Sequence, residues 1–245
     1  MKQILGLVLA LGVALSGRAQ TGKGTPVVIE LFTSEGCSSC PPADRLLMKF
    51  DHEQPIAGAD LIVLSEHVDY WNSGGWIDPY SSHEFSERQQ RYVSALRVPD
   101  PYTPQAVIDG RFEAVGNNAR QLEAAIQDAL KEKKIPLGLK AVRSEGGVHV
   151  ELSTSEVMAR GAEVYFAIAE DAVQSKVSAG ENGGHLLAHT AVVRSLTKGG
   201  KLQGDHASVS ADIKMNARWG KKLRVVAFVA DRDGGKILGS AMTEL

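Results

Sequence analysis

VVIELFTSEGCSSCPPAD, residues 27–44, is the stretch of sequence that decides the fold. It opens with a run of mostly apolar and β-branched residues, which is typical of a buried strand. Cys37 and Cys40 follow, separated by two serines. Pro41 and Pro42 come next, and prolines are tolerated in the first turn of a helix. The stretch therefore predicts a strand, a cysteine pair and a helix in direct succession.

Strand and helix signals alternate from this stretch to about Pro136. Leu61–Leu64 predicts a second short buried strand, and after a long loop Ser81–Glu84 fits a capping box that opens a helix. Asp109-Gly110 lies between two apolar runs and predicts a hairpin. A last amphipathic helix should end before Pro136. The predicted order, β-α-β-α-β-β-α, favours an α/β thioredoxin-like fold with a mixed central sheet and flanking helices.

A different pattern begins at Leu137. Val148, Val150 and Leu152 alternate with polar residues, as expected of a half-buried strand. Further strand-like runs follow, and glycine pairs such as Gly199-Gly200 are expected to separate them. Short strands with glycine turns and no helical period favour an all-β, sandwich-like domain over residues 137–245 that packs on the thioredoxin-like domain.

The amino terminus resembles a secretory signal peptide. Lys2 is followed by the apolar run Ile4–Leu15 and by small residues that permit a cut after Ala19. The run is shorter than the roughly 20 residues that a spanning helix needs, although a membrane-anchored or buried N-terminal helix is the alternative. The predicted division is a signal peptide at 1–19, the thioredoxin-like domain at 20–136 and the β domain after it, with no membrane span in the mature chain. We expect a periplasmic or secreted protein.

Composition narrows the possible partners. Removal of Lys2 and Arg18 with the signal peptide would leave 25 basic against 29 acidic residues and change the net charge from −2 to −4. This balance gives no basic footprint for nucleic acid or for an anionic membrane. The chain has two cysteines, and in an oxidising compartment they can form a disulfide. No cofactor is expected, and the oligomeric state is left open.

Several stretches resemble a bacterial family of secreted thioredoxin-like proteins known only as a domain of unknown function. The resemblance covers nearly all of the mature chain and implies the fold and export but no substrate. An acidic residue more often follows the Tyr-Trp pair in that family, where this chain has Asn72. The stretches are 27–44, His67–Tyr92 (HVDYWNSGGWIDPYSSHEFSERQQRY), Tyr102–Gly110 (YTPQAVIDG), Gly180–Arg194 (GENGGHLLAHTAVVR) and Asp231–Gly239 (DRDGGKILG).

The cysteine pair is the predicted catalytic centre. At a helix N-terminus, free N–H groups and the helix dipole favour the thiolate of Cys37 and lower its pKa, so Cys37 is the expected nucleophile. Cys40, one turn further in, would resolve the mixed disulfide. A purely structural disulfide is the alternative, although a loop this short gains little stability from closure.

Other residues are expected around the pair. In thioredoxin-like proteins a proline before the third core strand is cis and packs against the cysteines, and Thr103-Pro104 stands at that position; an ordinary trans proline is the alternative. Glu30, in the first strand, is predicted to relay a proton to Cys40; a glutamate that faces solvent or is hydrogen-bonded locally is the alternative. His67 follows the second strand at its carboxyl end, where sites collect. Together with Trp71 it would line a substrate cleft or pack the long loop.

Two histidines of the second half, His185 and His189, lie near Glu181 in the sequence. They are predicted to be surface histidines of a strand, and a metal site there is the weaker alternative.

The function expected is a thiol-disulfide oxidoreductase that exchanges disulfides with exported proteins and is served by a redox partner protein. A second possibility is a copper- or zinc-binding protein that uses the cysteines with a histidine such as His67, although a closed zinc site wants four ligands. A third is a redox-silent adaptor that binds a partner through the β domain.

Overall fold

A computed structural model describes residues 17–18, 24–205, 207–232 and 235–245. The expected signal peptide lies largely outside these residues. Strands and helices alternate in the first half of the described chain, as the hydrophobic pattern predicts. The elements are β1 (Gly17–Arg18), β2 (Thr25–Thr33), α1 (Pro41–Glu53), β3 (Ala59–His67), the short 3-10 helix η1 (Asn72–Gly74), α2 (His83–Leu96), β4 (Gln105–Ile108), β5 (Phe112–Val115) and α3 (Ala119–Ala129).

Every element described after residue 137 is a strand. The glycine pair Gly199-Gly200, expected to separate two strands, instead lies inside one long strand where the pairing register shifts between Lys198 and Gly200. A glycine pair can therefore mark a bulge as well as a turn. These strands are β6 (Gly138–Ser144), β7 (Gly147–Ser153), β8 (Met158–Glu170), β9 (Val173–Lys176), β10 (Leu186–His189), β11 (Val192–Gly204), β12 (Ser208–Lys214), β13 (Leu223–Ala230) and β14 (Ile237–Glu244).

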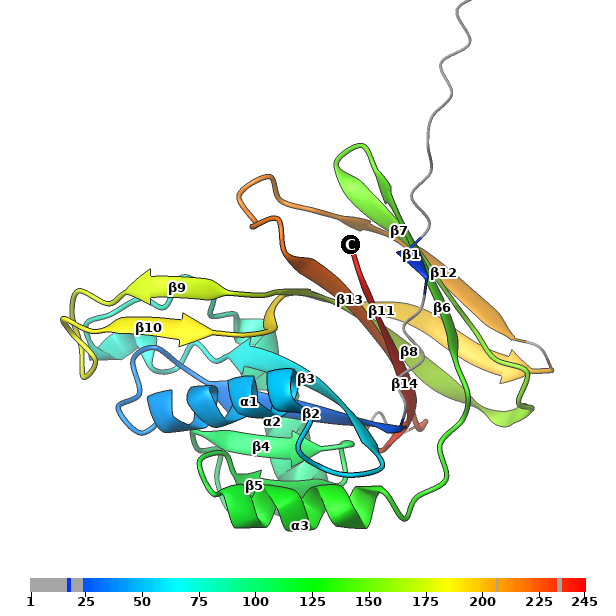
Figure 1. Ribbon diagram of the computed structural model, residues 1–245, viewed down its shortest axis with the longest axis horizontal. Coiled ribbons are helices and arrows are strands. Elements are labelled where there is room, and N and C mark those ends of the chain that lie inside the picture. The colour runs from blue at the N-terminus through cyan, green and yellow to red at the C-terminus, as the bar shows by residue number, and fades with distance from the viewer. Residues whose placement is uncertain (1–16, 19–23, 206, 233–234) are drawn as a thin grey trace, which may run out of the picture.

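One mixed sheet of eight strands, in the order β14-β13-β8-β11-β3-β2-β4-β5, runs through both halves of the chain. β2 is parallel to β3 and antiparallel to β4, and β11 joins the sheet parallel to β3. The expected boundary at residue 137 falls between α3 and β6, but the sheet continues across it. The architecture is therefore a mixed α/β sheet with few helices and many strands (Figure 1).

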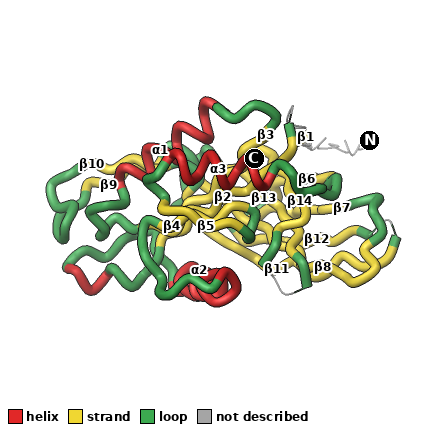
Figure 2. The backbone as a smooth tube through the Cα atoms, turned by 90° about the horizontal axis from the view of Figure 1, so that it is seen from below, coloured by secondary structure: helices red, strands yellow, loops and turns green. Residues whose placement is uncertain are grey.

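The helices cover both faces of the sheet. α1 and α3 lie on one side of the strands and α2 on the other (Figure 2). Leu47, Phe50 and Ile126 from α1 and α3 pack with Ile29 and Leu31 of β2 in the largest hydrophobic core. Burial of apolar surface of this kind is the main stabilising term of such a sheet. Within the described residues, no helix has the length and apolar character needed to cross a membrane.

A second layer covers the other end of the large sheet. β1, β6, β7 and β12 form a four-stranded sheet. Val148, Val150 and Leu152, which alternate along β7 as the sequence pattern predicts, are all buried. They pack with Phe166 of β8 and Val225 of β13 in a separate core. Two sheets thus face each other at this end of the molecule.

The hairpin of β9 and β10 is the element that brings the second half of the chain to the cysteines. It pairs as a separate two-stranded sheet and extends from the large sheet alongside α1 (Figure 1). Its turn, residues 177–185, reaches the loop between β2 and α1, as the contacts below show.

Candidate functional site

Cys37 and Cys40 form a disulfide at the start of α1, with Cα atoms 5.4 Å apart. Cys40 occupies the N-cap position of α1, and prolines fill the first two helical positions. The backbone carbonyl of Cys40 accepts from the N–H groups of Ala43 and Asp44 at 2.8 and 3.0 Å. The disulfide therefore lies at the positive end of a helix dipole, where developing negative charge on sulfur is stabilised.

Thr103 and Trp71 lie beside the disulfide loop. The Thr103-Pro104 peptide is cis, as predicted. The Thr103 carbonyl accepts from the Ser39 hydroxyl at 3.4 Å, and the Thr103 hydroxyl accepts from the Trp71 indole N–H at 2.7 Å. Gly36 makes room for this contact, because a Cβ atom there would lie 3.2 Å from the Cβ of Trp71. The structure thus brings Trp71, Thr103 and the cysteines together.

A turn from the second half of the chain is hydrogen-bonded to the backbone of the disulfide loop. The Asn182 side-chain amide donates to the backbone carbonyls of Glu35 and Cys37, both at 2.9 Å. The Glu181 carboxylate accepts from the Ser38 backbone N–H at 2.9 Å. Both cysteines are completely buried, with 0% exposure. We call the turn at residues 179–184 the clasp; no sequence pattern indicated its contact with the cysteines.

His67 is fully buried at the end of β3 and belongs to a polar cluster behind the disulfide loop. Its Nδ1 atom lies 2.7 Å from Oδ2 of Asp78, and that oxygen also accepts from the Glu35 backbone N–H at 2.8 Å. Burial alone would lower the pKa of His67, but the Asp78 carboxylate more than offsets this and raises it. In turn, burial would raise the pKa of Asp78, and the His67 charge lowers it. His67 and Asp78 therefore form a buried ion pair.

His189 is buried, and its prediction as a surface histidine was wrong. It belongs to β10, and the hairpin turns it inward, where its ring lies 4.9 Å from the ring of His67. Its Nε2 atom is 3.3 Å from Oε1 of Glu35, and its Nδ1 atom is 3.6 Å from Oδ2 of Asp44. The alternating pattern of a two-stranded hairpin does not reveal which face meets the rest of the protein, so the sequence could not place this residue. His185, by contrast, is exposed.

Asp44 completes the cluster from α1. It lies one turn after Cys40, and its Oδ1 atom accepts from the Thr33 hydroxyl at 2.9 Å. Burial raises the pKa of Asp44, although His189, His67 and the Thr33 hydrogen bond act against that change. Asp44, Glu35 and Asp78 were not predicted as site residues.

Glu30 lies away from the disulfide. Successive residues of a strand point to opposite faces, so Glu30 faces α2 while its neighbours Ile29 and Leu31 pack in the core beneath α1. Its carboxylate accepts from Nε of Arg88 at 2.5 Å and from the Tyr92 hydroxyl at 2.6 Å. All three side chains are buried. Glu30 therefore binds Arg88 and Tyr92 on the face of the sheet that α2 covers, and it does not contact Cys40.

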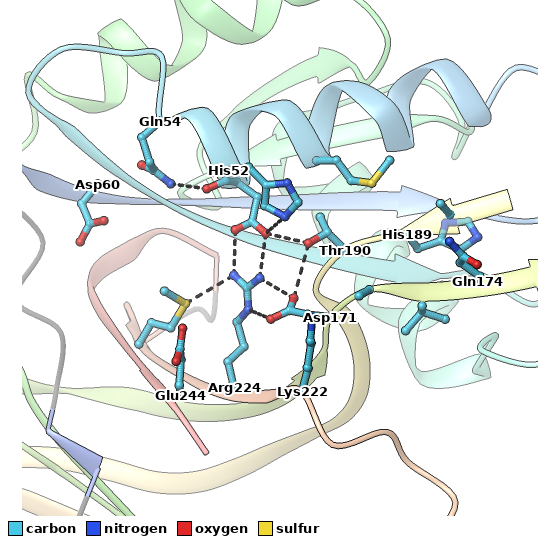
Figure 3. Close-up of a pocket in the computed structure, with 16 residues that line it drawn as sticks. His52, Gln54, Asp60, Asp171, Gln174, His189, Thr190, Lys222, Arg224 and Glu244 are labelled. Atoms are coloured by element: carbon cyan, nitrogen blue, oxygen red, sulfur yellow. Dashed lines mark hydrogen bonds and ion pairs between the residues drawn. The ribbon is translucent and has the colours of Figure 1, made fainter.

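A cavity of about 610 Å³ lies on the other side of the hairpin. Figure 3 shows Arg224 next to Asp171 inside it and His189 at its far end beside Gln174. The guanidinium of Arg224 also donates to both carboxylate oxygens of Asp51, at 2.7 and 2.8 Å. This ion pair ties the end of α1 to β13. His189 therefore lies between this cavity and the buried polar cluster.

The described residues contain no group of three or more His, Cys, Asp and Glu side chains arranged to hold a metal ion. The alternative prediction was a copper or zinc site in which His67 joins the two cysteines, and the described part of the chain contains no such group. His67 is instead engaged with Asp78.

The fold and the site define a mixed α/β protein with a disulfide at the start of a helix. Residues 28–230 match the model of the family described as a protein of unknown function, DUF1223. The chain belongs to this family. Curated proteins give no match.

Solved structures show the same fold in a related protein. A crystal structure of a protein from Agrobacterium tumefaciens has 27% sequence identity and a TM-score of 0.68, and the match covers 91% of this chain and 95% of that one. An alkylpurine DNA glycosylase from Pseudomonas fluorescens, bound to DNA, has 17% identity and a TM-score of 0.21, with 83% and 45% covered. The second value is too low to support any argument.

Proposed function

We propose that this protein is an exported thiol-disulfide oxidoreductase with a thioredoxin-like core, in which Cys37 attacks and Cys40 resolves. The observation that most supports this function is the disulfide at the N-terminus of α1 with the Thr103 carbonyl beside it. The order β3-β2-β4-β5, with parallel β2 and β3 and antiparallel β4 and β5, supports the thioredoxin-like assignment. Exported proteins with exchangeable disulfides would be the substrates, and a redox partner would restore the pair.

Single-cysteine variants of the purified protein test the proposal. Cys37→Ser should abolish insulin reduction in the presence of a small thiol, because the nucleophile is lost. Cys40→Ser should instead accumulate mixed disulfides with protein partners, because attack survives and resolution does not. The reverse pattern, or a Cys37 thiol that is alkylated with the pKa of a free cysteine, about 8.5, would contradict these roles.

A redox-silent adaptor is the second candidate. It is favoured by the complete burial of both cysteines beneath the clasp, because an attacking thiol must reach sulfur. If the native disulfide resists reduction until the protein unfolds, this candidate replaces the first.

A further inference from the structure

Four buried polar atoms without a hydrogen-bond partner among the described residues gather behind the disulfide. They are Oε1 of Glu35, Nε2 of His67, and both ring nitrogens of His189. Native proteins carry few buried polar atoms without a formed hydrogen bond. Here His189 Nε2 and Glu35 Oε1 lie 3.3 Å apart, so ionisable groups are held next to one another, an arrangement in which a proton can change place.

Asp44 connects this cluster to Cys40. Residues four apart on a helix lie on the same face, and helical side chains lean toward the N-terminus. The Asp44 side chain, on α1, therefore leans toward Cys40. The carboxyl is 5% exposed, and its pKa is raised by burial. A buried carboxyl with a raised pKa holds a proton more readily than an exposed one, which suits it to accept one from a neighbouring thiol.

His189 lies beside Asp44. Its Nδ1 atom is 3.6 Å from Asp44 Oδ2, and the residue also belongs to the wall of the cavity, although its side chain is only 1% exposed. It is thus the one described residue that takes part in both the cluster's ion pairs and the cavity wall.

We infer that Asp44 accepts the proton of the Cys40 thiol when Cys40 resolves a mixed disulfide, and that His189 positions Asp44. The inference rests on the proposed function. In this step the Cys40 thiol loses its proton to the Asp44 carboxylate, and its sulfur bonds to Cys37 Sγ. The bond from Cys37 to the substrate sulfur breaks, and the substrate leaves as a thiolate that takes a proton from solvent. Two electrons pass from the cysteine pair to the substrate disulfide over the whole cycle.

The charged groups facing Asp44 come from three segments: His189 on β10, His67 on β3 and Asp78 in the loop after β3. His67 and Asp78 balance each other as an ion pair. Glu35 lies against the Nε2 side of His189, opposite Asp44. This arrangement keeps one histidine ring between two carboxyl groups, where it can take a proton from one side.

Reaction of the reduced protein with dithiobis-nitrobenzoate isolates the proposed step. Attack by Cys37 releases one coloured thiolate, and resolution by Cys40 releases a second from the mixed disulfide. Asp44→Asn should slow the second release about 100-fold at neutral pH, the size of a typical general-base contribution, and leave the first nearly unchanged. The deficit should shrink toward high pH, because hydroxide then deprotonates Cys40 directly. His189→Gln should slow the same phase by about tenfold with the same pH dependence.

Matched controls come from the surface. Asp128→Asn and His149→Gln change exposed residues of the same types and should leave both phases as in the wild type. A second release that Asp44→Asn leaves unchanged, or slows equally at every pH, overturns the inference. If Asp44→Asn does not fold, as judged by circular dichroism, the His189→Gln profile decides on the same criterion. Because this probe needs no protein substrate, failure of insulin reduction would count against the proposed function and not against the relay.

Discussion

Replacement of Asn182 should open the disulfide loop to attack. In Asn182→Ala the two hydrogen bonds to the Glu35 and Cys37 carbonyls, both 2.9 Å long, are lost. If each bond contributes about 1 kcal/mol net, their loss destabilises the closed form of the clasp by about 2 kcal/mol relative to the open form. Since about 1.4 kcal/mol is a factor of ten, reduction through the open form should be about 30-fold faster.

The assay is the rate at which excess dithiothreitol reduces the native disulfide, measured by quenching with an alkylating reagent and counting the modified cysteines by mass. Asn216→Ala is the matched control, because the Asn216 side chain accepts from the Arg218 N–H in the turn after β12. Its rate should equal that of the wild type. Asn182→Asp, which keeps the size of the side chain but loses its N–H donors, should be at least as fast as Asn182→Ala.

Two results would refute this reasoning. If Asn182→Ala is reduced within about twofold of the wild-type rate, the clasp does not limit access to sulfur. If Asn216→Ala accelerates reduction as much as Asn182→Ala, the effect is general destabilisation. A circular dichroism melt of each variant separates local opening from global unfolding, because an Asn182 variant that opens only the clasp should keep most of its melting temperature.

Three further predictions concern stability. Arg88→Met should lower the free energy of unfolding in urea by about 3–5 kcal/mol, because it leaves the Glu30 carboxylate buried without its cation, yet it should not change the alkylation of the reduced cysteines on the other face. The raised pKa of His67 and lowered pKa of Asp78 predict a pair whose stabilisation is complete between about pH 3.8 and 6.5, their ordinary values. This stabilisation is lost as pH rises through the pKa of His67 or falls through that of Asp78. The urea midpoints of the wild type and His67→Gln should therefore differ most between these two pH values. A difference in midpoint that is the same at every pH contradicts the ion pair. Arg224→Met leaves the carboxylates of Asp51 and Asp171 without their cation and should lower the free energy of unfolding by about 3 kcal/mol in the same urea assay. An unchanged free energy would show that this ion pair between α1 and β13 is dispensable.

The parts of the fold that the sequence predicted well are those that local sequence patterns determine. The helix start predicted at Ser81–Glu84 is confirmed, but the N-cap is Ser82, whose hydroxyl accepts from the Glu84 N–H, and not Ser81 as the predicted capping box requires. The last helix of the first half ends at Ala129, before Pro136. Thr103-Pro104 is cis and lies against the disulfide loop. The helix start and the helix end are decided by residues within a few positions of one another, so a pattern can report them, whereas the place of Thr103-Pro104 was expected from its likeness to thioredoxin-like proteins.

Long-range pairing accounts for what the sequence did not reveal. Asn182 reaches Cys37 across 145 positions, and nothing local in the clasp indicates that contact. The face on which Glu30 lies depends on the register of β2, and a shift of one residue would reverse it. An ionisable residue among apolar neighbours predicts burial, and Glu30 is buried, but burial alone does not say which helix covers it.

The pairing of β11 with β3 explains why the second half of the chain belongs to the site. β11 begins beside the end of β3, where Val192 pairs with Ser65 and the Ala191 carbonyl accepts from the Ser65 N–H at 2.9 Å. His67 ends β3 two residues further on, and His189 precedes β11 by three. The two histidines are therefore brought together by the same strand pairing that joins the halves of the sheet. A substitution that loosens this pairing should disturb the buried cluster, because His67 and His189 reach it from the two strands' ends.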